Sequence, residues 1–166
     1  MIRLANIKDL DNIMDIIREI QKEMKAENNP QWNEDDDYPN KEKFITDIEN
    51  KSLYIYEGED IIKGFIAITK DNGEYDELLE TTNKPAFILH RIAIKKDNRK
   101  EGIATILFNY AEDLAKEANI KLLKADTEEH NIKMNNLFTK LGFIKKVEFE
   151  YDDYPGHYIY YEKELN

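Results

Sequence analysis

The sequence predicts an α/β fold of the α+β type, in which helices flank one central mixed β-sheet. Apolar residues recur at helical spacing in some segments, while β-branched and aromatic residues fill others in the manner of strands. The predicted order is one strand, two helices, two strands, then strand, helix, strand, helix and two closing strands. No internal repeat or Pro/Gly/Ser-rich linker divides the 166 residues, so we expect a single domain over residues 1–166.

The first predicted helix is amphipathic, can be capped by Asn6 and runs to about Ala26, because apolar residues recur every three or four positions. Residues 27–40, ENNPQWNEDDDYPN, are rich in proline, asparagine and acidic residues and predict a loop. Asn40 can cap a second helix that ends near Asn50. Two runs of β-branched and aromatic residues then predict a hairpin: residues 52–57 and 61–70.

In the C-terminal half, the longest run of strand type is FILHRIAI, residues 87–94, which we interpret as a central strand. The strongest helical pattern follows, from Gly102 to about Ala118. The remaining predicted elements are a strand, a helix stopped by Gly142 and two closing strands: residues 120–126, 131–141, 143–151 and 157–165.

Composition narrows the function. The chain has 35 acidic residues against 24 lysines and arginines, a net charge of −11. Such a surface repels phosphate backbones and anionic lipid, so we expect neither nucleic acid nor a membrane as partner. The absence of cysteine excludes disulfides, thiolate metal sites and a cysteine nucleophile. No apolar run approaches a signal peptide or the ~20 residues of a membrane span, so we expect a cytoplasmic protein.

Residue spacing excludes several kinds of site. No two of the six glycines lie within five positions of each other, so neither G-x-G-x-x-G nor the Walker P-loop is present. Ser52 is the only serine and no nucleophile-elbow motif surrounds it, which excludes that class of hydrolase. The histidines lie far apart in sequence, and Asp35, Asp36 and Asp37 lack the pattern of a calcium loop, so we predict no metal site.

Residues 95–102, KKDNRKEG, gather four cations before a glycine in an otherwise acidic chain. They lie between the predicted central strand and the strongest predicted helix, which brings the free N–H groups of a helix N-terminus beside Arg99 and Lys100. Gly102 has no Cβ to keep an anion away from the backbone, and Ala104 is similarly small. A cationic turn is often only a solvated loop, but this combination predicts an anion site.

Arg99-x-x-Gly102-x-Ala104, after a strand and opening a helix, resembles the R/Q-x-x-G-x-G/A motif of the GNAT superfamily of N-acetyltransferases, which bind acetyl-CoA. The similarity extends to the order of elements over nearly the whole chain, to LHRIAI (89–94) and to DTEEHNIKMNNLFTKLGF (126–143). It implies a GNAT-like domain with a mixed, mostly antiparallel sheet of about six to seven strands flanked by four helices. It also implies acetyl-CoA as co-substrate and no metal.

The resemblance assigns cofactor contacts residue by residue. It implies that the backbone of Ile92, Ala93 and Ile94 pairs with the pantetheine arm. Asn131 falls where the family often has an asparagine that binds the pantetheine, although it could equally cap its own helix. Phe138 stands where many relatives carry a tyrosine that protonates the leaving thiolate, and phenylalanine has no proton to donate. Six residues are implied to wrap the pyrophosphate: Arg99, Lys100, Glu101, Gly102, Ile103 and Ala104.

An amine attacks a thioester only when neutral, so a base is expected beside the thioester. His90 is the first candidate, because strict alternation in FILHRIAI places it on the face of Ile88 and Ile92 and because histidine titrates in the useful range. His90 could instead be a hydrogen-bonded core residue, and Asp126 is the second candidate base. Arg91 is expected to pair with a carboxylate under a flanking helix and to have no catalytic role.

The loop between the first two helices resembles the family's usual lid over the amine site. Trp32 and Tyr38 bracket its acidic run, and Tyr75 would border the same cleft from the other side. Aromatic rings and carboxylates suit a cationic amine. We therefore expect an N-acetyltransferase that moves acetyl from acetyl-CoA to a primary amine, first of all a small cationic metabolite, by direct attack without a covalent enzyme intermediate.

Two other functions stay open. One is acetylation of a peptide or protein amine, which would need an open groove. The other is a non-catalytic acyl-CoA-binding sensor or interaction module, which Phe138 and the uncertain base would suit. The tyrosine-rich C-terminal segment could cover a second subunit as readily as its own sheet, so a homodimer also stays open.

Overall fold

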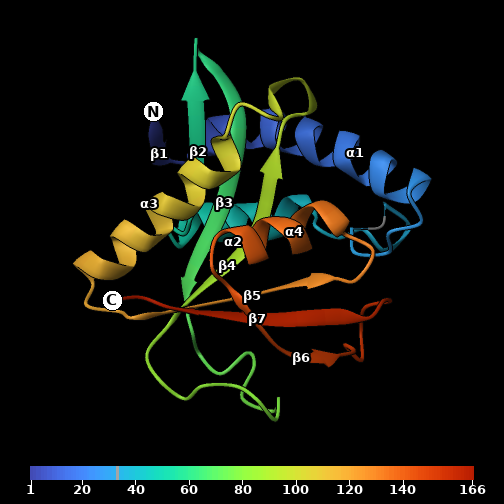
Figure 1. The fold of residues 1–166 in the computed structure, drawn as a ribbon. Coiled ribbons are helices and arrows are strands. Elements are labelled where there is room, and N and C mark those ends of the chain that lie inside the picture. Colours follow the sequence, from blue (N-terminus) through green and yellow to red (C-terminus); the bar gives the residue numbers. More distant parts are fainter. Residues whose placement is uncertain (33) are drawn as a thin grey trace.

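The computed structural model describes residues 1–32 and 34–166 (Figure 1). The strands are β1 (Ile2–Leu4), β2 (Leu53–Gly58), β3 (Ile61–Lys70), β4 (Phe87–Ile94), β5 (Leu122–Glu128), β6 (Ile144–Phe149) and β7 (Tyr158–Glu164). Within the described residues these seven strands form one sheet in the order β1-β2-β3-β4-β5-β7-β6. Neighbours are antiparallel except β4 and β5, which run parallel. The mixed, mostly antiparallel sheet is confirmed.

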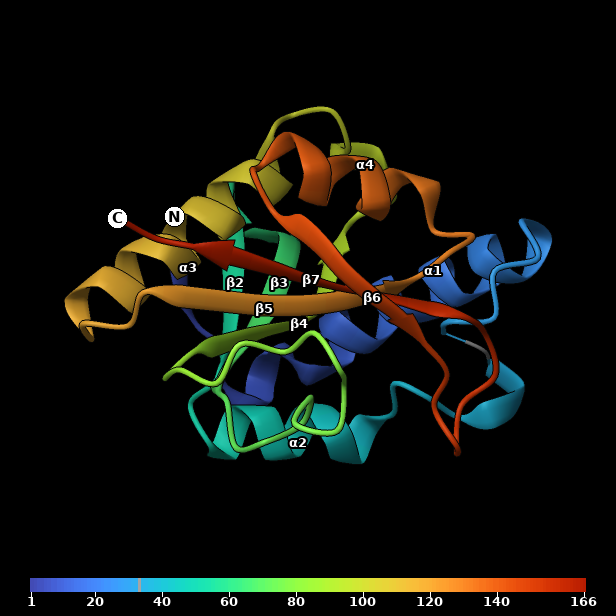
Figure 2. The same ribbon diagram turned by 60° about the horizontal axis from the view of Figure 1, so that its bottom comes forward.

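Four α-helices within the described residues cover the two faces of the sheet: α1 (Leu10–Ala26), α2 (Lys41–Glu49), α3 (Ile103–Glu117) and α4 (Ile132–Lys140). The helices α1 and α2 lie on one face, where Ile13 and Phe44 join a core with Phe65 of β3. The helices α3 and α4 lie on the other face, where Leu107 and Phe138 join a second core (Figure 2). In the described part of the chain, no helix combines the length and apolarity needed to cross a bilayer.

Three of the predicted helix caps are confirmed. The side chains of Asn6, Asn40 and Asn131 each accept a backbone N–H two or three residues further on. Asn6 caps a short 3₁₀ turn that leads into α1. The strand β5 begins two residues later than predicted, because the N–H of Ile120 closes the end of α3 by donating to the carbonyl of Ala115 at 2.8 Å.

The tyrosine-rich C-terminal segment is used within the chain. Tyr158, Tyr160 and Tyr161 of β7 are at most 4% exposed. The Tyr160 hydroxyl donates to Glu162 at 2.5 Å, and the Tyr161 hydroxyl donates to Asn135 of α4 at 2.6 Å. Of the two roles left open for this segment, covering its own sheet is the one that the packing of these rings supports.

A β-bulge interrupts the pairing of β4 with β3. Two residues of β4, Arg91 and Ile92, lie opposite the single residue Ile66, and Arg91 takes a φ of +46°. The extra residue reverses the alternation of side chains. His90 stays on the α2 face, bonded to Thr69, while Ile92 joins the core under α3. The predicted placement of His90 on the face of Ile92 is therefore wrong, because strict alternation cannot anticipate an inserted residue.

The strands β4 and β5 pair only where they begin. Phe87 lies opposite Leu123 and Ile88 opposite Lys124, and the described residues contain no further pair between the two strands. Beyond Ile88 the strands separate and leave a gap in the middle of the sheet. The edge of β4 that faces β5 is consequently unpaired over most of its length, which leaves its backbone groups available to a ligand.

Candidate active site

Two cavities meet at the gap between β4 and β5. The larger, about 510 Å³, lies between α1, the start of α3 and α4, and we call it the groove. The smaller, about 170 Å³, lies between β4, β5, the loop after α1 and the segment after β6, and we call it the pocket. The two cavities adjoin, because five residues line both of them: Met24, Trp32, Ile92, Asn131 and Met134.

The N-terminus of α3 forms one end of the groove. Gly102 precedes the helix with a φ of +76°, and apart from its own chain neighbours no described atom lies within 4 Å of the position that its Cβ would take. Lys100 is also in the left-handed region, with a φ of +69°. The first N–H groups of a helix have no partner inside it. The turn is thus open and presents N–H groups to the groove, which is what an anion needs.

The Arg99 guanidinium lies at the groove and is bound by α1. Its two terminal nitrogens donate to the two carboxylate oxygens of Glu23 at 2.9 and 2.6 Å. Lys96 Nζ lies 4.0 Å from the same carboxylate. The hydrogen bonds from Arg99 hold the pKa of Glu23 below its usual value. Arg99 therefore fastens the loop before α3 to α1, and Lys100 is left as a groove-lining cation of this loop.

Most residues that the resemblance assigned to the cofactor lie together in the groove. Glu101 does not line the groove, and its carboxylate lies 3.7 Å from Lys63 Nζ. Phe138 lines the pocket and is 2% exposed, with its ring packed against Phe108 and Tyr161. The groove-lining members of the assigned set are Ile92, Ala93, Ile94, Arg99, Lys100, Gly102, Ile103, Ala104 and Asn131.

Aromatic rings form much of the pocket wall. Trp32, Tyr38 and Tyr75, which the sequence suggested for the acceptor, all line it. The ring of Tyr38 lies 5.1 Å from that of Tyr154, so the loop after α1 and the segment after β6 meet beside the pocket. The sequence reasoning missed three lining tyrosines, although the tyrosine-rich tail carried them: Tyr151, Tyr154 and Tyr158.

Asp126 of β5 presents a carboxylate to the pocket. Tyr75 and Tyr151 both donate to its Oδ2, each at 2.6 Å. Its Oδ1 accepts no hydrogen bond from the described residues, among which no side-chain oxygen is both buried and unpartnered, so Oδ1 is accessible. Burial raises the pKa of Asp126 and the two tyrosine hydrogen bonds lower it; burial prevails, and the pKa lies above its usual value.

His90 lines the pocket from the other side of the gap. His90 and Asp126 each lie two residues beyond the last pair of β4 and β5. The His90 Nε2 lies 2.9 Å from the Thr69 hydroxyl. Burial, followed by the charges of Arg91 and Lys43, lowers the pKa of His90 to about 3. The imidazole is therefore neutral at physiological pH and holds a proton weakly.

Arg91 pairs with a carboxylate of a flanking helix, as predicted. Its Nε and Nη2 donate to the two oxygens of Asp47 of α2 at 2.7 and 2.9 Å, and its Nη1 donates to the Tyr38 hydroxyl at 3.3 Å. The side chains of Arg91 and Asp47 are 5% and 4% exposed. Arg91 lines the pocket, but its charge is matched by Asp47.

Gln31, which the sequence reasoning did not single out, joins the loop after α1 to β5 and α4. Its Oε1 accepts from the Thr127 hydroxyl at 2.9 Å and from the Asn131 amide at 3.1 Å. The Asn131 Oδ1 accepts from the N–H of Met134 at 3.3 Å and so caps α4. The capping role of Asn131 is confirmed, and its amide group also holds the loop that carries Trp32.

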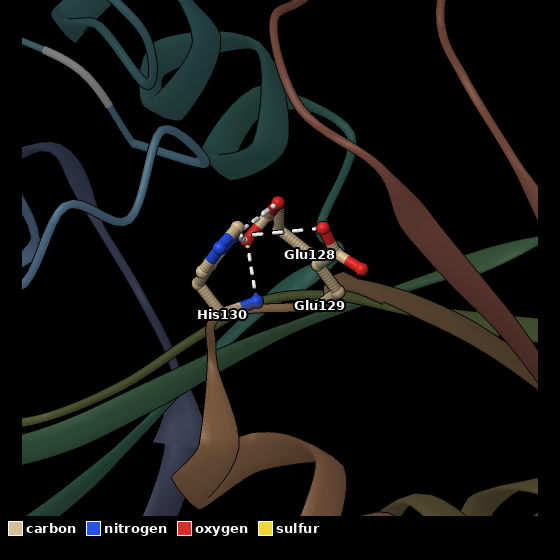
Figure 3. A group of neighbouring side chains, drawn as sticks. All are labelled: Glu128, Glu129 and His130. Atoms are coloured by element: carbon tan, nitrogen blue, oxygen red, sulfur yellow. Dashed lines mark hydrogen bonds and ion pairs between the residues drawn. The ribbon is translucent and has the colours of Figure 1, made fainter.

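A group of ligand-type side chains, Glu128, Glu129 and His130, lies at the turn from β5 to α4 (Figure 3). Glu128 has a side chain that is 1% exposed. Its carboxylate accepts the N–H of His130 at 2.6 Å and that of His157 at 3.3 Å, and it lies 3.0 Å from His130 Nδ1. Donors of the chain itself thus satisfy this carboxylate, which anchors the turn to the segment before β7.

Comparison with known proteins agrees with this geometry. Residues 14–143 match the family model for the acetyltransferase (GNAT) family. No curated protein matches the sequence significantly.

Similar solved structures cover the chain from end to end. A GNAT family acetyltransferase from Streptococcus agalactiae is 27% identical, covers 100% of this chain and 95% of its own, and has a TM-score of 0.87. A Staphylococcus aureus protein assigned as an acetyltransferase is 32% identical, with coverage of 100% and 99% and a TM-score of 0.76. The ribosomal-protein-alanine N-acetyltransferase of Brucella melitensis shares the fold, at 19% identity, 99% coverage of both chains and a TM-score of 0.71. Because the family model spans most of the chain, and these structures reproduce its sheet and helices, the chain belongs to the GNAT acetyltransferase family, whose members use acetyl-CoA as co-substrate.

Proposed function

We propose that this chain is an N-acetyltransferase that moves an acetyl group from acetyl-CoA to the primary amine of a small cationic molecule, by direct attack and without a covalent enzyme intermediate. The observation that carries the proposal is that the groove and the pocket adjoin at the gap between β4 and β5, where five residues line both. An anion cradle lies at one end and the accessible carboxylate of Asp126 at the other. A donor held in the groove and an amine held in the pocket would meet at the gap.

The groove fits acetyl-CoA in charge and in backbone geometry. Gly102 leaves open the space that a Cβ would fill, beside the free N–H groups of α3. Lys100 and Lys133 line the groove and would offset the charge of a pyrophosphate, whereas the charge of Arg99, which also lines it, is already neutralised by Glu23. The unpaired edge of β4 beyond Ile88 offers backbone groups to the amide-rich arm of the cofactor. Acetyl-CoA supplies the activated acetyl group as a thioester.

We assign the base to Asp126 in preference to His90. An ammonium group that enters the pocket must lose one proton before it can attack. The Asp126 Oδ1 is accessible, and burial raises the affinity of this carboxylate for a proton. The pKa of His90, about 3, makes its imidazole the weaker acceptor of the two. Tyr75 and Tyr151 hold the Asp126 carboxylate in place through Oδ2, which leaves Oδ1 to receive the proton.

No tyrosine occupies position 138 to protonate the leaving thiolate. Phe138 packs instead among other aromatic rings. A thiol has a pKa near ~8.5, so its anion is a tolerable leaving group close to neutral pH. We propose that the thiolate of coenzyme A leaves without a proton from this position.

The dimensions of the pocket favour a small acceptor over a peptide. The pocket holds about 170 Å³, and Gln31 and Tyr38 tie the loop after α1 to β5 and to the segment after β6. The Brucella protein, which is named as an enzyme that acetylates a ribosomal protein, shares only the fold with this chain, at 19% identity, and so does not argue for a peptide acceptor here. A folded or extended peptide would need this loop to open.

Two measurements test the proposal in sequence. Calorimetric titration with acetyl-CoA should give micromolar binding, and thiol release should then rise when small amines are added and remain at its basal rate with basic peptides. Thiol release that responds to peptides alone would replace the small acceptor with a peptide. Tight binding without amine-dependent release would favour the sensor or interaction module, and no heat at millimolar acetyl-CoA would refute the proposed activity.

A further inference from the structure

We infer that the pocket selects amines whose reacting nitrogen has no carboxylate on the neighbouring carbon. The class of acceptor would thus be the amines that arise when amino acids lose carbon dioxide, and a decarboxylation would be the class of reaction that supplies them. This inference rests on the proposed acetyl transfer and adds a rule for the acceptor. It is carried by the charges that line the pocket.

His90 is neutral, so the lining side chains that can bring a charge to a bound amine are those of Arg91 and Asp126. An ammonium group beside Asp126 would favour the ionised form of this carboxylate. Three of the five N–H groups of the Arg91 guanidinium already donate, two of them to Asp47 and one to Tyr38. Asp47 is itself buried and brings the compensating negative charge. Among the described lining residues, Asp126 therefore carries the charge that no opposite charge balances.

The open oxygen of Asp126 decides what the pocket can hold. Tyr75 and Tyr151 occupy Oδ2, and both are neutral donors that leave the negative charge in place. An ammonium group at Oδ1 would gain an ion pair within a wall of aromatic rings, which also attract cations. The site is thus built for one cation and supplies no second, unpaired cation for an anion.

A free amino acid places its carboxylate one carbon away from its amine. When the amine lies at Asp126 Oδ1, the carboxylate must lie in the same small pocket, close to a charge of its own sign. The Arg91 guanidinium would give that carboxylate little net attraction, because the buried Asp47 already neutralises its charge. Lys43, whose charge acts on His90, does not line the pocket. Like charges brought together in this way discriminate strongly between ligands.

Matched sets of ligands separate charge from size. One set is agmatine, arginine and arginine methyl ester; another is phenethylamine, phenylalanine and phenylalanine methyl ester. Each methyl ester is larger than the amino acid but lacks its negative charge. The six ligands would be titrated calorimetrically into the protein saturated with coenzyme A, so that the readout is binding and does not require turnover.

The expected result is that the amine and the ester of at least one set bind, and that the amino acid of that set binds at least about 10-fold more weakly than its ester. Equal binding of amino acid and ester would overturn the inference. Binding of the amine with rejection of both larger ligands would also overturn it, because size would then explain the selection. Failure of all six ligands to bind would refute an amine site in the pocket.

The variant Asp126→Asn keeps the size of the side chain and an oxygen for the two tyrosines but removes the charge. Its ratio of ester binding to amino-acid binding should fall towards one; an unchanged ratio would show that Asp126 is not the source of selection. Coenzyme A binding by the variant, measured in the same calorimeter, reports that it is folded. Acetyl-CoA that binds without turnover of any amine would count against the proposed acetyl transfer, whereas turnover of arginine as fast as agmatine would count against the selection rule alone.

Discussion

A carboxylate and an imidazole stand on opposite sides of the gap, and their surroundings act on them differently. Burial raises the pKa of Asp126 and lowers that of His90, because burial disfavours the charged form of each group. The result is that the carboxylate gains affinity for a proton while the imidazole loses it. The sequence named both residues as candidate bases, and it could not rank them, because the ranking depends on burial and on tyrosines distant in the chain.

Replacing Asp126 by Asn should lower kcat by about 10²- to 10⁴-fold, the usual contribution of a general base, with little change in acetyl-CoA affinity. Replacing His90 by Ala, the matched control across the gap, should cost less. A plot of log kcat/KM against pH should fall on the acid side, because Asp126 accepts a proton only when ionised, and its midpoint should lie above the usual pKa of aspartate. A larger loss with His90→Ala than with Asp126→Asn would reassign the base.

Gly102 can be tested by adding a side chain in two sizes. Gly102→Ala places one methyl group in the open turn, and Gly102→Val a branched group, at a φ of +76°. A left-handed conformation costs residues other than glycine roughly 1–2 kcal/mol, so stability should fall modestly. Acetyl-CoA binding should weaken progressively from glycine to alanine to valine. Calorimetry on variants with native circular dichroism checks this, and unchanged affinity in Gly102→Val would mean that the pyrophosphate binds elsewhere.

At the scale of elements, sequence patterns identified every helix and strand that surrounds the gap, because each has a clear apolar period or cap. These patterns did not predict the bulge in β4. Nothing in FILHRIAI marks an inserted residue, since the insertion is stabilised by the pairing of Arg91 with Asp47, two residues that lie far apart in sequence. The sequence also did not predict the roles of Gln31 and Tyr151 in the pocket. Both residues lie in irregular segments, and their roles follow from hydrogen bonds to residues of β5 that are distant in the chain.

The segment between β3 and β4 owes its position to a buried lysine of β5. Lys124 is 1% exposed and donates to Asp71 at 2.5 Å, and Tyr75 of the same segment reaches Asp126. Lys124→Met should lower the free energy of unfolding by about 3–5 kcal/mol, because Asp71 would stay buried without its partner. The double variant Lys124→Met, Asp71→Asn should recover part of this loss in urea unfolding. Additive losses would mean that the pair is not coupled.

At the scale of the whole molecule, the order of elements and the family were predictable, because a strand, a cationic turn, a glycine and an apolar helix follow one another in the chain. The identity of the acceptor was not, because it depends on a pocket lined by residues from many separate segments of the chain. The net charge of −11 is the basis for expecting neither nucleic acid nor a membrane as partner. It said nothing of the local balance of charges, in which Arg99 is neutralised by Glu23 and Asp126 is not neutralised at all.

The unpaired stretch between β4 and β5 has a mechanical consequence. Among the described residues, two pairs between β4 and β5 join a block of four strands to a block of three, so the two blocks of the sheet are paired only where these two strands begin. A ligand bound in the gap would contact both blocks of strands and would couple them into one cooperative unit. Saturation with acetyl-CoA at about 100 times its Kd should add about 2.7 kcal/mol to stability. Amide hydrogen exchange should then slow in β4 and β5 together. Slowing confined to the turn before α3 would show that the two blocks of strands open independently even when the cofactor is bound.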